Sequence, residues 1–148
     1  MGEGVIVVDT SLAIMWAVPE PYSDRALEWM RYWRSRDVTL HAPFLMAAEA
    51  ANALYRAVIR GDVNLEEARS ALAVVLSDSG VGLVEVTGLA ERAMELARRL
   101  DRPAVYDCYF LALAEWFDCA MWTGDERFYN AVRGRTDRVR WVGEPVGA

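Results

Sequence analysis

The chain has 148 residues, a net charge of −6 and 54% hydrophobic residues, which predicts a single folded domain with a full core. No apolar run approaches the roughly 20 residues that cross a bilayer, and the N-terminus lacks the basic segment of a signal peptide. We therefore expect a cytoplasmic protein without a membrane span. All 16 basic residues are Arg, which excludes mechanisms that need a Schiff-base lysine or a phosphate-loop lysine.

Short apolar runs alternate with helical patterns along the whole chain. The expected order is a strand at 5–8, a helix at 12–18, a helix at 24–34 capped by Ser23, a strand at 38–41, a helix at 43–60, a helix at 65–76 capped by Asn64, a strand at 83–86, helices at 89–100 and 103–117, a strand at 119–122, a helix at 125–132 and a strand at 139–142. Strands that alternate with helices predict an α/β fold around a mainly parallel sheet.

Two carboxylates follow predicted buried strands. Asp9 ends the run VIVVD, and Asp125 follows CAMWTG. The carboxyl ends of parallel strands border the crevice in which α/β proteins bind ligands. Each acid is also a good N-cap for the helix that follows it, so position alone leaves a capping role open.

Two further carboxylates lie on largely apolar helical stretches. Glu49 stands among small and apolar neighbours in LMAAEAANAL, with no Arg three or four residues away to receive its charge. Asp107 lies in the first turns of the helix YDCYFLALAEW, where the helix dipole favours an anion. A solvated Glu and a dipole-complementing Asp remain alternatives for this pair.

Together the four acids predict an anionic cluster at one end of the sheet. Two carboxylates about 4 Å apart repel by roughly 4 kcal/mol at an effective dielectric constant of about 20. Protons or a divalent cation must compensate such a cluster. Oxygen ligands without His or Cys select Mg²⁺ or Mn²⁺, ions that activate water and bind phosphate oxygens in phosphodiester cleavage.

The segments VVDTSLA, EAANAL, VYDCYFLALAE and TGDERFY, in this order, resemble the PIN-domain ribonucleases, specifically the toxins of VapBC-type toxin–antitoxin pairs. The resemblance covers nearly the whole chain. It implies a three-layer α/β/α fold and a Mg²⁺-dependent endoribonuclease site, with Mn²⁺ as a possible substitute. By motif, the metal-binding and catalytic acids are Asp9, Glu49, Asp107 and Asp125. It also implies an RNA substrate, a homodimer and a cognate antitoxin segment lying in a groove.

Polar residues near the acids are candidates for orienting them. The hydroxyls of Thr10, Ser11 and Thr123 could bond to carboxylates or water, although capping explains Thr10 and Ser11 equally well. Asn52 lies one helical turn from Glu49 and could bond a group behind it. Glu126 has no counterpart in the resemblance, and surface exposure is as good an explanation as metal contact.

Arginines concentrate near the C-terminus and could contact RNA phosphates, a role balanced against an ordinary solvated surface. The candidates are Arg127 and Arg133, with Arg135, Arg138 and Arg140 nearby. The single histidine, His41, and the two cysteines, Cys108 and Cys119, are interpreted as structural, since no nucleophile–His or CxxC spacing is present.

Other functions compete with the toxin interpretation. A receiver domain needs a lysine near its last strands, and a haloacid-dehalogenase-type phosphatase needs a second Asp where Ser11 stands. A PIN nuclease of RNA maturation or quality control and a non-catalytic PIN-fold binding module remain alternatives. The aromatic second helix, with Trp29, Met30, Tyr32 and Trp33, predicts a partner-binding surface, although an ordinary core explains it equally well.

Overall fold

A computed structural model describes residues 4–147, and its centre is a parallel sheet of five strands in the order β3-β2-β1-β4-β5. The strands are β1 (Val5–Val8), β2 (Thr39–Pro43), β3 (Gly82–Val84), β4 (Met121–Thr123) and β5 (Val139–Trp141). Every pairing between neighbouring strands is parallel. The interior of β1 is buried, as its β-branched run predicts for a strand covered on both faces.

Successive strands are added to one side of β1 first and then to its other side. From β1 it proceeds outward through β2 and β3, and after β3 it returns to β4 on the other side of β1. Val8 pairs with Trp122, so the residues that follow these two strands, Asp9 and Thr123, are neighbours. A crevice at such a topological switch point is the usual ligand site of an open α/β sheet.

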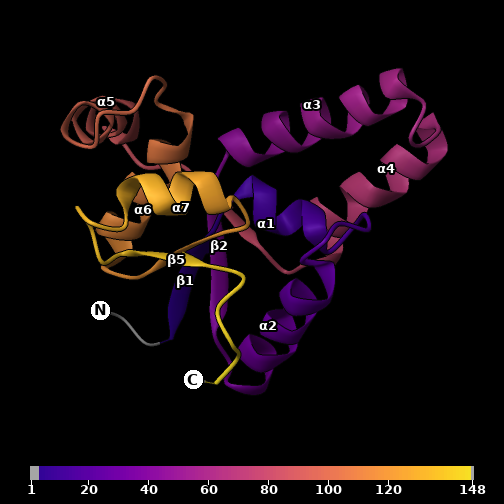
Figure 1. The fold of residues 1–148 in the computed structure, drawn as a ribbon, viewed down its shortest axis with the longest axis horizontal. Helices are drawn as coiled ribbons and strands as arrows, with labels where there is room; N and C mark the ends of the chain where they lie inside the picture. The colour runs from indigo at the N-terminus through magenta and orange to yellow at the C-terminus, as the bar shows by residue number, and fades with distance from the viewer. Residues whose placement is uncertain (1–3, 148) are drawn as a thin grey trace.

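Within residues 4–147, seven α-helices and one π-helical turn connect the strands. They are α1 (Thr10–Met15), α2 (Ser23–Ser35), α3 (Leu45–Arg60), α4 (Leu65–Ala73), η1 (Val74–Asp78), α5 (Leu89–Arg99), α6 (Tyr106–Phe117) and α7 (Glu126–Val132). In Figure 1, α5 and α6 lie to the left of β1 and β2, while α2, α3 and α4 lie to the right. This arrangement confirms the expected three-layer α/β/α fold.

Several helix ends follow from local sequence chemistry. The Asn64 side chain accepts a hydrogen bond from the Glu67 backbone N–H, and the Glu67 carboxylate accepts one from the Asn64 backbone N–H, which is the predicted capping box. Gly61 ends α3 at φ +83°, a left-handed conformation that glycine adopts without a Cβ penalty. Ser23 is not the cap of α2. Its hydroxyl instead accepts from the Glu20 backbone and donates to the Val18 carbonyl.

Three of the four residues named on α2 belong to the core, so the prediction of a partner-binding surface is wrong for Trp29, Met30 and Trp33, while Tyr32 is partly buried. Trp29 and Trp33 are 5% and 3% exposed, and Met30 is also buried. Both indole rings contact Trp122 of β4, at 4.3 and 5.3 Å between ring centroids. A buried strand that carries a Trp needs large partners in the helix above it, and α2 provides them.

The residues interpreted as structural are packed as expected. Cys108 and Cys119 are buried free thiols, and burial raises the pKa of each to about 11. The His41 ring stacks on Phe117 at 4.8 Å between centroids. No helix within residues 4–147 has the length and hydrophobicity to cross a membrane.

Candidate functional site

The four acids singled out in the sequence line one cavity of about 450 Å³ at the switch point. Asp9 follows β1, Glu49 lies on α3, Asp107 on α6 and Asp125 between β4 and α7. Two helices and two strand ends, far apart in the sequence, therefore bring four carboxylates together.

Asp9 is buried and held on both of its oxygens. Its Oδ1 accepts from the Leu12 backbone N–H at 3.0 Å and from the Ser11 hydroxyl at 2.7 Å, and its Oδ2 accepts from the Thr123 hydroxyl. Asp9 is thus the N-cap of α1 as well as a wall of the cavity. The two explanations that the sequence left open, helix capping and a place in the site, are therefore compatible for Asp9.

The loop after β4 is tied to the start of α1. The Ser11 hydroxyl accepts from the Gly124 backbone N–H at 3.0 Å, and the Thr123 hydroxyl accepts from the Asp125 backbone N–H at 3.0 Å. A Cβ at Gly124 would lie 3.1 Å from backbone atoms of Leu12, so only glycine permits this close approach. The two hydroxyls predicted to orient carboxylates therefore fix Asp9 relative to the Asp125 loop.

The other three acids are held less tightly. Glu49 accepts from the Thr10 hydroxyl at 2.8 Å, which is the contact predicted for a hydroxyl beside the cluster. Asp125 accepts from the Phe128 backbone N–H at 3.0 Å as the N-cap of α7. Asp107 accepts no hydrogen bond from residues 4–147, although it lies in the first turn of α6. Its carboxylate is therefore free for a ligand in the cavity.

The electrostatics of the cavity disfavour several negative charges together. Burial raises the pKa of Asp9 to about 6, against the opposing effect of its hydrogen bonds, and the charge of Asp107 adds to the rise. Burial also raises the pKa of Glu49 and of Asp107, and neighbouring carboxylates add to both shifts. Desolvation and like-charge repulsion are the two causes expected for clustered acids.

The donor set fits a hard divalent cation in its chemistry. The cavity offers carboxylates and hydroxyls and neither His nor Cys, which is the selection that favours Mg²⁺ or Mn²⁺. Within residues 4–147, however, no three His, Cys, Asp or Glu side chains stand in a geometry that could hold a metal ion. Binding would require the less constrained carboxylates, Glu49 and Asp107, to adopt other rotamers.

The structure does not bring every candidate to the cavity. Asn52 is exposed, lines neither this cavity nor its neighbour, and makes no side-chain hydrogen bond to a described residue. The C-terminal arginines also lie outside it: Arg133 covers the Tyr129 ring, while Arg135 and Arg138 bond to Asp101 and Asp118. Arg140 pairs with Glu144, and Arg127 and Glu126 are exposed.

Glu20 is a lining residue that sequence reasoning missed. It lies in the segment between α1 and α2, and it borders both the acid cavity and a second cavity beside it. Its neighbours Pro19 and Pro21 indicated only the end of a helix. Nothing in that pattern predicted that the segment between α1 and α2 lies beside α3.

The raised pKa of Asp9 predicts how stability depends on pH. In the unfolded chain this carboxyl titrates near 3.8 and in the folded protein near 6, so the folded state binds more protons between these values. The stability that Asp9 contributes therefore rises as the pH falls from 7 to 5, by about 1 kcal/mol. We compare the free energy of unfolding of the wild type with that of Asp9→Asn. The wild-type value minus the variant value should increase by this amount as the pH falls from 7 to 5.

Urea unfolding of both proteins in EDTA at pH 5 and pH 7 measures this difference, and titrating groups outside the cavity cancel between them. A difference that stays constant or shrinks toward pH 5 would show that the folded protein does not raise the Asp9 pKa.

Comparison with known proteins agrees with the fold. The sequence model of the PIN domain family matches residues 6–134. The VapC ribonuclease Mb0985 of Mycobacterium bovis and the ribonuclease VapC9 of Mycobacterium tuberculosis are each 31% identical over 123 residues, which is 83% of this chain and 87% of the relative. The crystal structure of PAE2754 from Pyrobaculum aerophilum superposes with a TM-score of 0.67 at 23% identity, over 93% of this chain and 90% of that one.

Proposed function

The chain belongs to the PIN domain family, and from this premise we propose that it is a metal-dependent endoribonuclease of the toxin type. One observation carries the proposal: Asp9, Glu49, Asp107 and Asp125 line a single cavity at the switch point of the sheet. Perturbed carboxylates gathered in a cleft are typical of a catalytic site.

The four carboxylates would hold one or two Mg²⁺ ions. A bound ion supplies a Lewis acid for phosphate oxygens and lowers the pKa of the attacking water. Ser11 and Thr123 fix the rotamer of Asp9, so this ligand is oriented before an ion arrives, whereas Glu49 and Asp107 would turn toward the ion as it binds. Asp107, which accepts no hydrogen bond from residues 4–147, is the acid most available to an ion.

Proton transfer in the cavity falls to the same acids. The chain has no lysine, and its only histidine, His41, lies on β2 outside the cavity. In the metal-free protein burial raises the pKa of Asp9 to about 6, and a bound divalent cation would lower it again by favouring the carboxylate.

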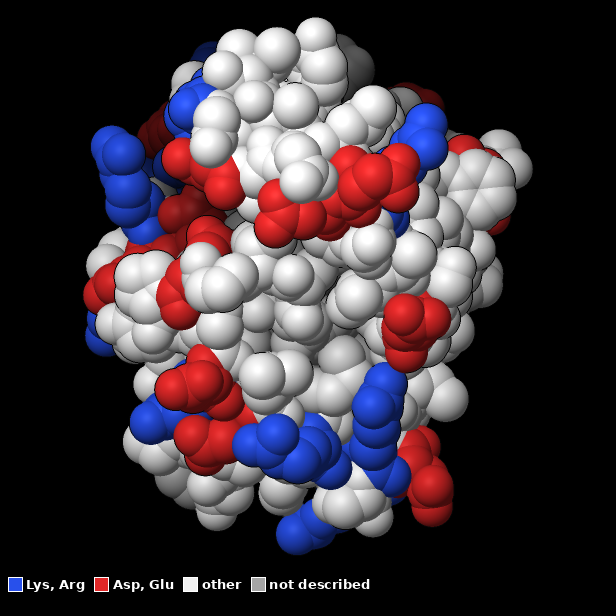
Figure 2. All heavy atoms as spheres, turned by 90° about the vertical axis from the view of Figure 1, so that its right-hand side faces the viewer, with Lys and Arg blue, Asp and Glu red and all other residues white. Residues whose placement is uncertain are grey.

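The protein is acidic, and the side viewed in Figure 2 shows no continuous basic surface to which RNA phosphates could bind. That face, formed by α2 and the α3–α4 hairpin, carries a band of Asp and Glu across its upper half, with Arg side chains scattered mainly below it. Phosphate contacts therefore depend on individual arginines close to the cavity.

The same proposal includes a cognate antitoxin and a homodimer, because the relatives named above are VapC ribonucleases. Large apolar side chains that an assembly could cover are exposed on α3, α5 and α6, whereas Trp29, Met30 and Trp33 of α2 face the core. The exposed side chains include Tyr55, Ile59, Met94, Tyr106 and Trp116.

Metal removal tests the proposed reaction. We expect EDTA to abolish cleavage of single-stranded RNA and to leave the fold intact, since a core of this size needs no structural metal. Mg²⁺ or Mn²⁺ restores cleavage, and Ca²⁺ restores it poorly because its coordination is looser. Gel analysis of labelled RNA follows cleavage, and circular dichroism follows the fold.

Undiminished cleavage after thorough chelation would overturn the metal mechanism. RNA binding without cleavage in any of these ions would instead favour a non-catalytic binding module.

A further inference from the structure

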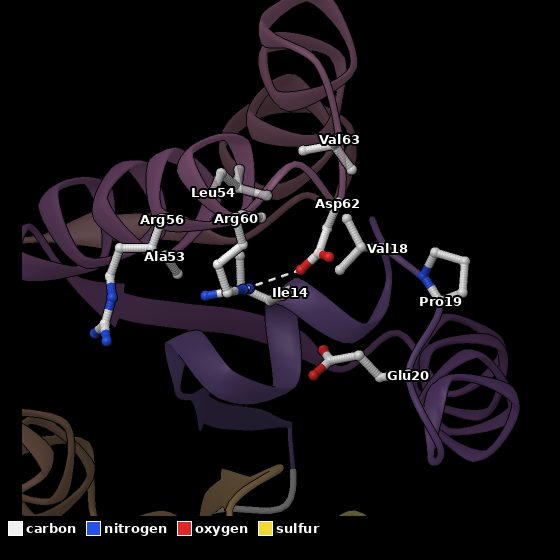
Figure 3. Close-up of a pocket in the computed structure, with 11 residues that line it drawn as sticks. Ile14, Val18, Pro19, Glu20, Ala53, Leu54, Arg56, Arg60, Asp62 and Val63 are labelled. Atoms are coloured by element: carbon white, nitrogen blue, oxygen red, sulfur yellow. Dashed lines mark hydrogen bonds and ion pairs between the residues drawn. The ribbon is translucent and has the colours of Figure 1, made fainter.

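A second cavity, of about 680 Å³, adjoins the acid cavity and shares part of its wall. Ile14, Glu20 and Ala53 line both. The second cavity lies between α3 and the segment from α1 to α2 (Figure 3). A chain leaving the acid cavity along α3 would enter it directly.

One face of α3 connects the two cavities. Glu49, Ala53, Arg56 and Arg60 are spaced by four, three and four residues, which places them on one side of a helix. Arg56 and Arg60 lie roughly 10 and 16 Å beyond Glu49 along the helix axis, at a rise of about 1.5 Å per residue. Figure 3 shows the Arg60 guanidinium beside Asp62, and the Arg56 side chain extending from α3 with its guanidinium apart from the other lining residues.

The two arginines differ in their partners. Arg60 pairs with Asp62 at 3.0 Å, and both side chains are more than half exposed. Arg56 makes neither a hydrogen bond nor an ion pair with residues 4–147, and it is exposed. An exposed ion pair such as Arg60–Asp62 is weak, so a phosphate can compete for Arg60 and can bind Arg56 without competition.

We propose that this second cavity is the subsite for the RNA backbone next to the scissile phosphate, with Arg56 as its main phosphate contact and Arg60 as the second. The inference rests on the proposed nuclease function and assigns a direction to the substrate strand. From the acid cavity the strand runs along α3 toward the α3–α4 turn. The lining also holds two acids, Glu20 and Asp62, so the phosphate contacts would come from the two arginines individually and not from a continuous positive groove.

Binding of a short, fluorescently labelled single-stranded RNA tests the assignment. Fluorescence anisotropy is measured in Ca²⁺, which keeps the acids compensated and cleavage slow, at several NaCl concentrations. We expect Arg56→Ala to raise the Kd roughly three- to tenfold and to lower the slope of log Kd against log salt by about 0.7, the loss of one phosphate contact. Arg56→Lys should retain the slope.

Two matched variants sharpen the test. Asp62→Asn frees Arg60 and should tighten RNA binding, an effect opposite in sign to that of Arg56→Ala. Arg69→Ala removes an exposed arginine of α4 that pairs with Glu66 and lines neither cavity, so it should leave Kd and slope unchanged. Thermal unfolding of each variant verifies the fold.

Wild-type affinity and salt slope in Arg56→Ala would overturn the subsite and leave the cavity to another occupant, such as a protein segment. Cleavage in Mg²⁺, measured separately, reports on the nuclease. A wild type that cleaves while Arg56→Ala binds normally refutes the subsite alone. A wild type that never cleaves but shows the expected Arg56 effect refutes the nuclease alone.

Discussion

Replacing Asp107 by Asn is expected to abolish RNA cleavage and to leave the metal-free protein at least as stable as the wild type. Burial and the charge of Asp125 raise the Asp107 pKa by more than the charge of Arg102 lowers it, and the carboxylate accepts no hydrogen bond from residues 4–147. Asn has nearly the same shape and removes the charge, so repulsion in the cavity falls. Thermal unfolding in EDTA and cleavage of RNA in Mg²⁺ measure the two effects on one preparation.

Glu91→Gln is the matched control. Glu91 is an exposed acid in the first turn of α5, away from the cavity, so only the helix dipole acts on it. This variant should lose about 0.3–1 kcal/mol of stability and keep its activity. If Asp107→Asn behaves in the same way, Asp107 is a dipole partner and the site has been assigned to the wrong residue.

Truncating Trp33 to Ala should produce the largest loss of stability among the substitutions considered. Trp33 is 3% exposed, stacks on Trp29 at 5.5 Å and meets Trp122 edge-on. Large-to-small changes of a buried Trp cost about 3–5 kcal/mol, a substantial part of the roughly 5–15 kcal/mol that stabilises a domain. Urea unfolding measures the change.

Trp116→Ala makes the same chemical change at a side chain of α6 that is among the exposed large hydrophobic residues, and it should cost far less. Equal stability of the two variants, with a shift to monomer in light scattering only for Trp33→Ala, would support the partner-surface interpretation of α2 after all.

The strand-end acids could be predicted because two independent signals coincide on them. Asp9 and Asp125 follow apolar runs that only buried strands explain, and parallel strands place their carboxyl ends at one edge. Glu49 depended on its apolar helical context, and Asp107 on its position in a helical first turn. Neither context says which way the helix faces, so only the folded structure brings both to the cavity.

The errors have a physical cause in common. Helical spacing identifies residues that share a face, but it does not say whether that face meets the sheet or the solvent. Trp29 and Trp33 were therefore assigned to a partner when they pack on Trp122, and Asn52 was assigned to the site when it is exposed. The helical spacing that places Arg56 on the same face of α3 as Glu49 is visible in the sequence. Its significance depends on the second cavity, which Glu20 helps to line and which only the structure shows.

Titration of Mn²⁺ into the metal-free protein, followed by isothermal calorimetry, tests the central claim most directly. The wild type and Glu91→Gln should bind Mn²⁺ saturably, and Asp107→Asn should bind it much more weakly, because the acids of one cavity share the ion. Equal Mn²⁺ binding by Asp107→Asn and the wild type, or no saturable binding by the wild type, would contradict a metal-dependent site built from Asp9, Glu49, Asp107 and Asp125.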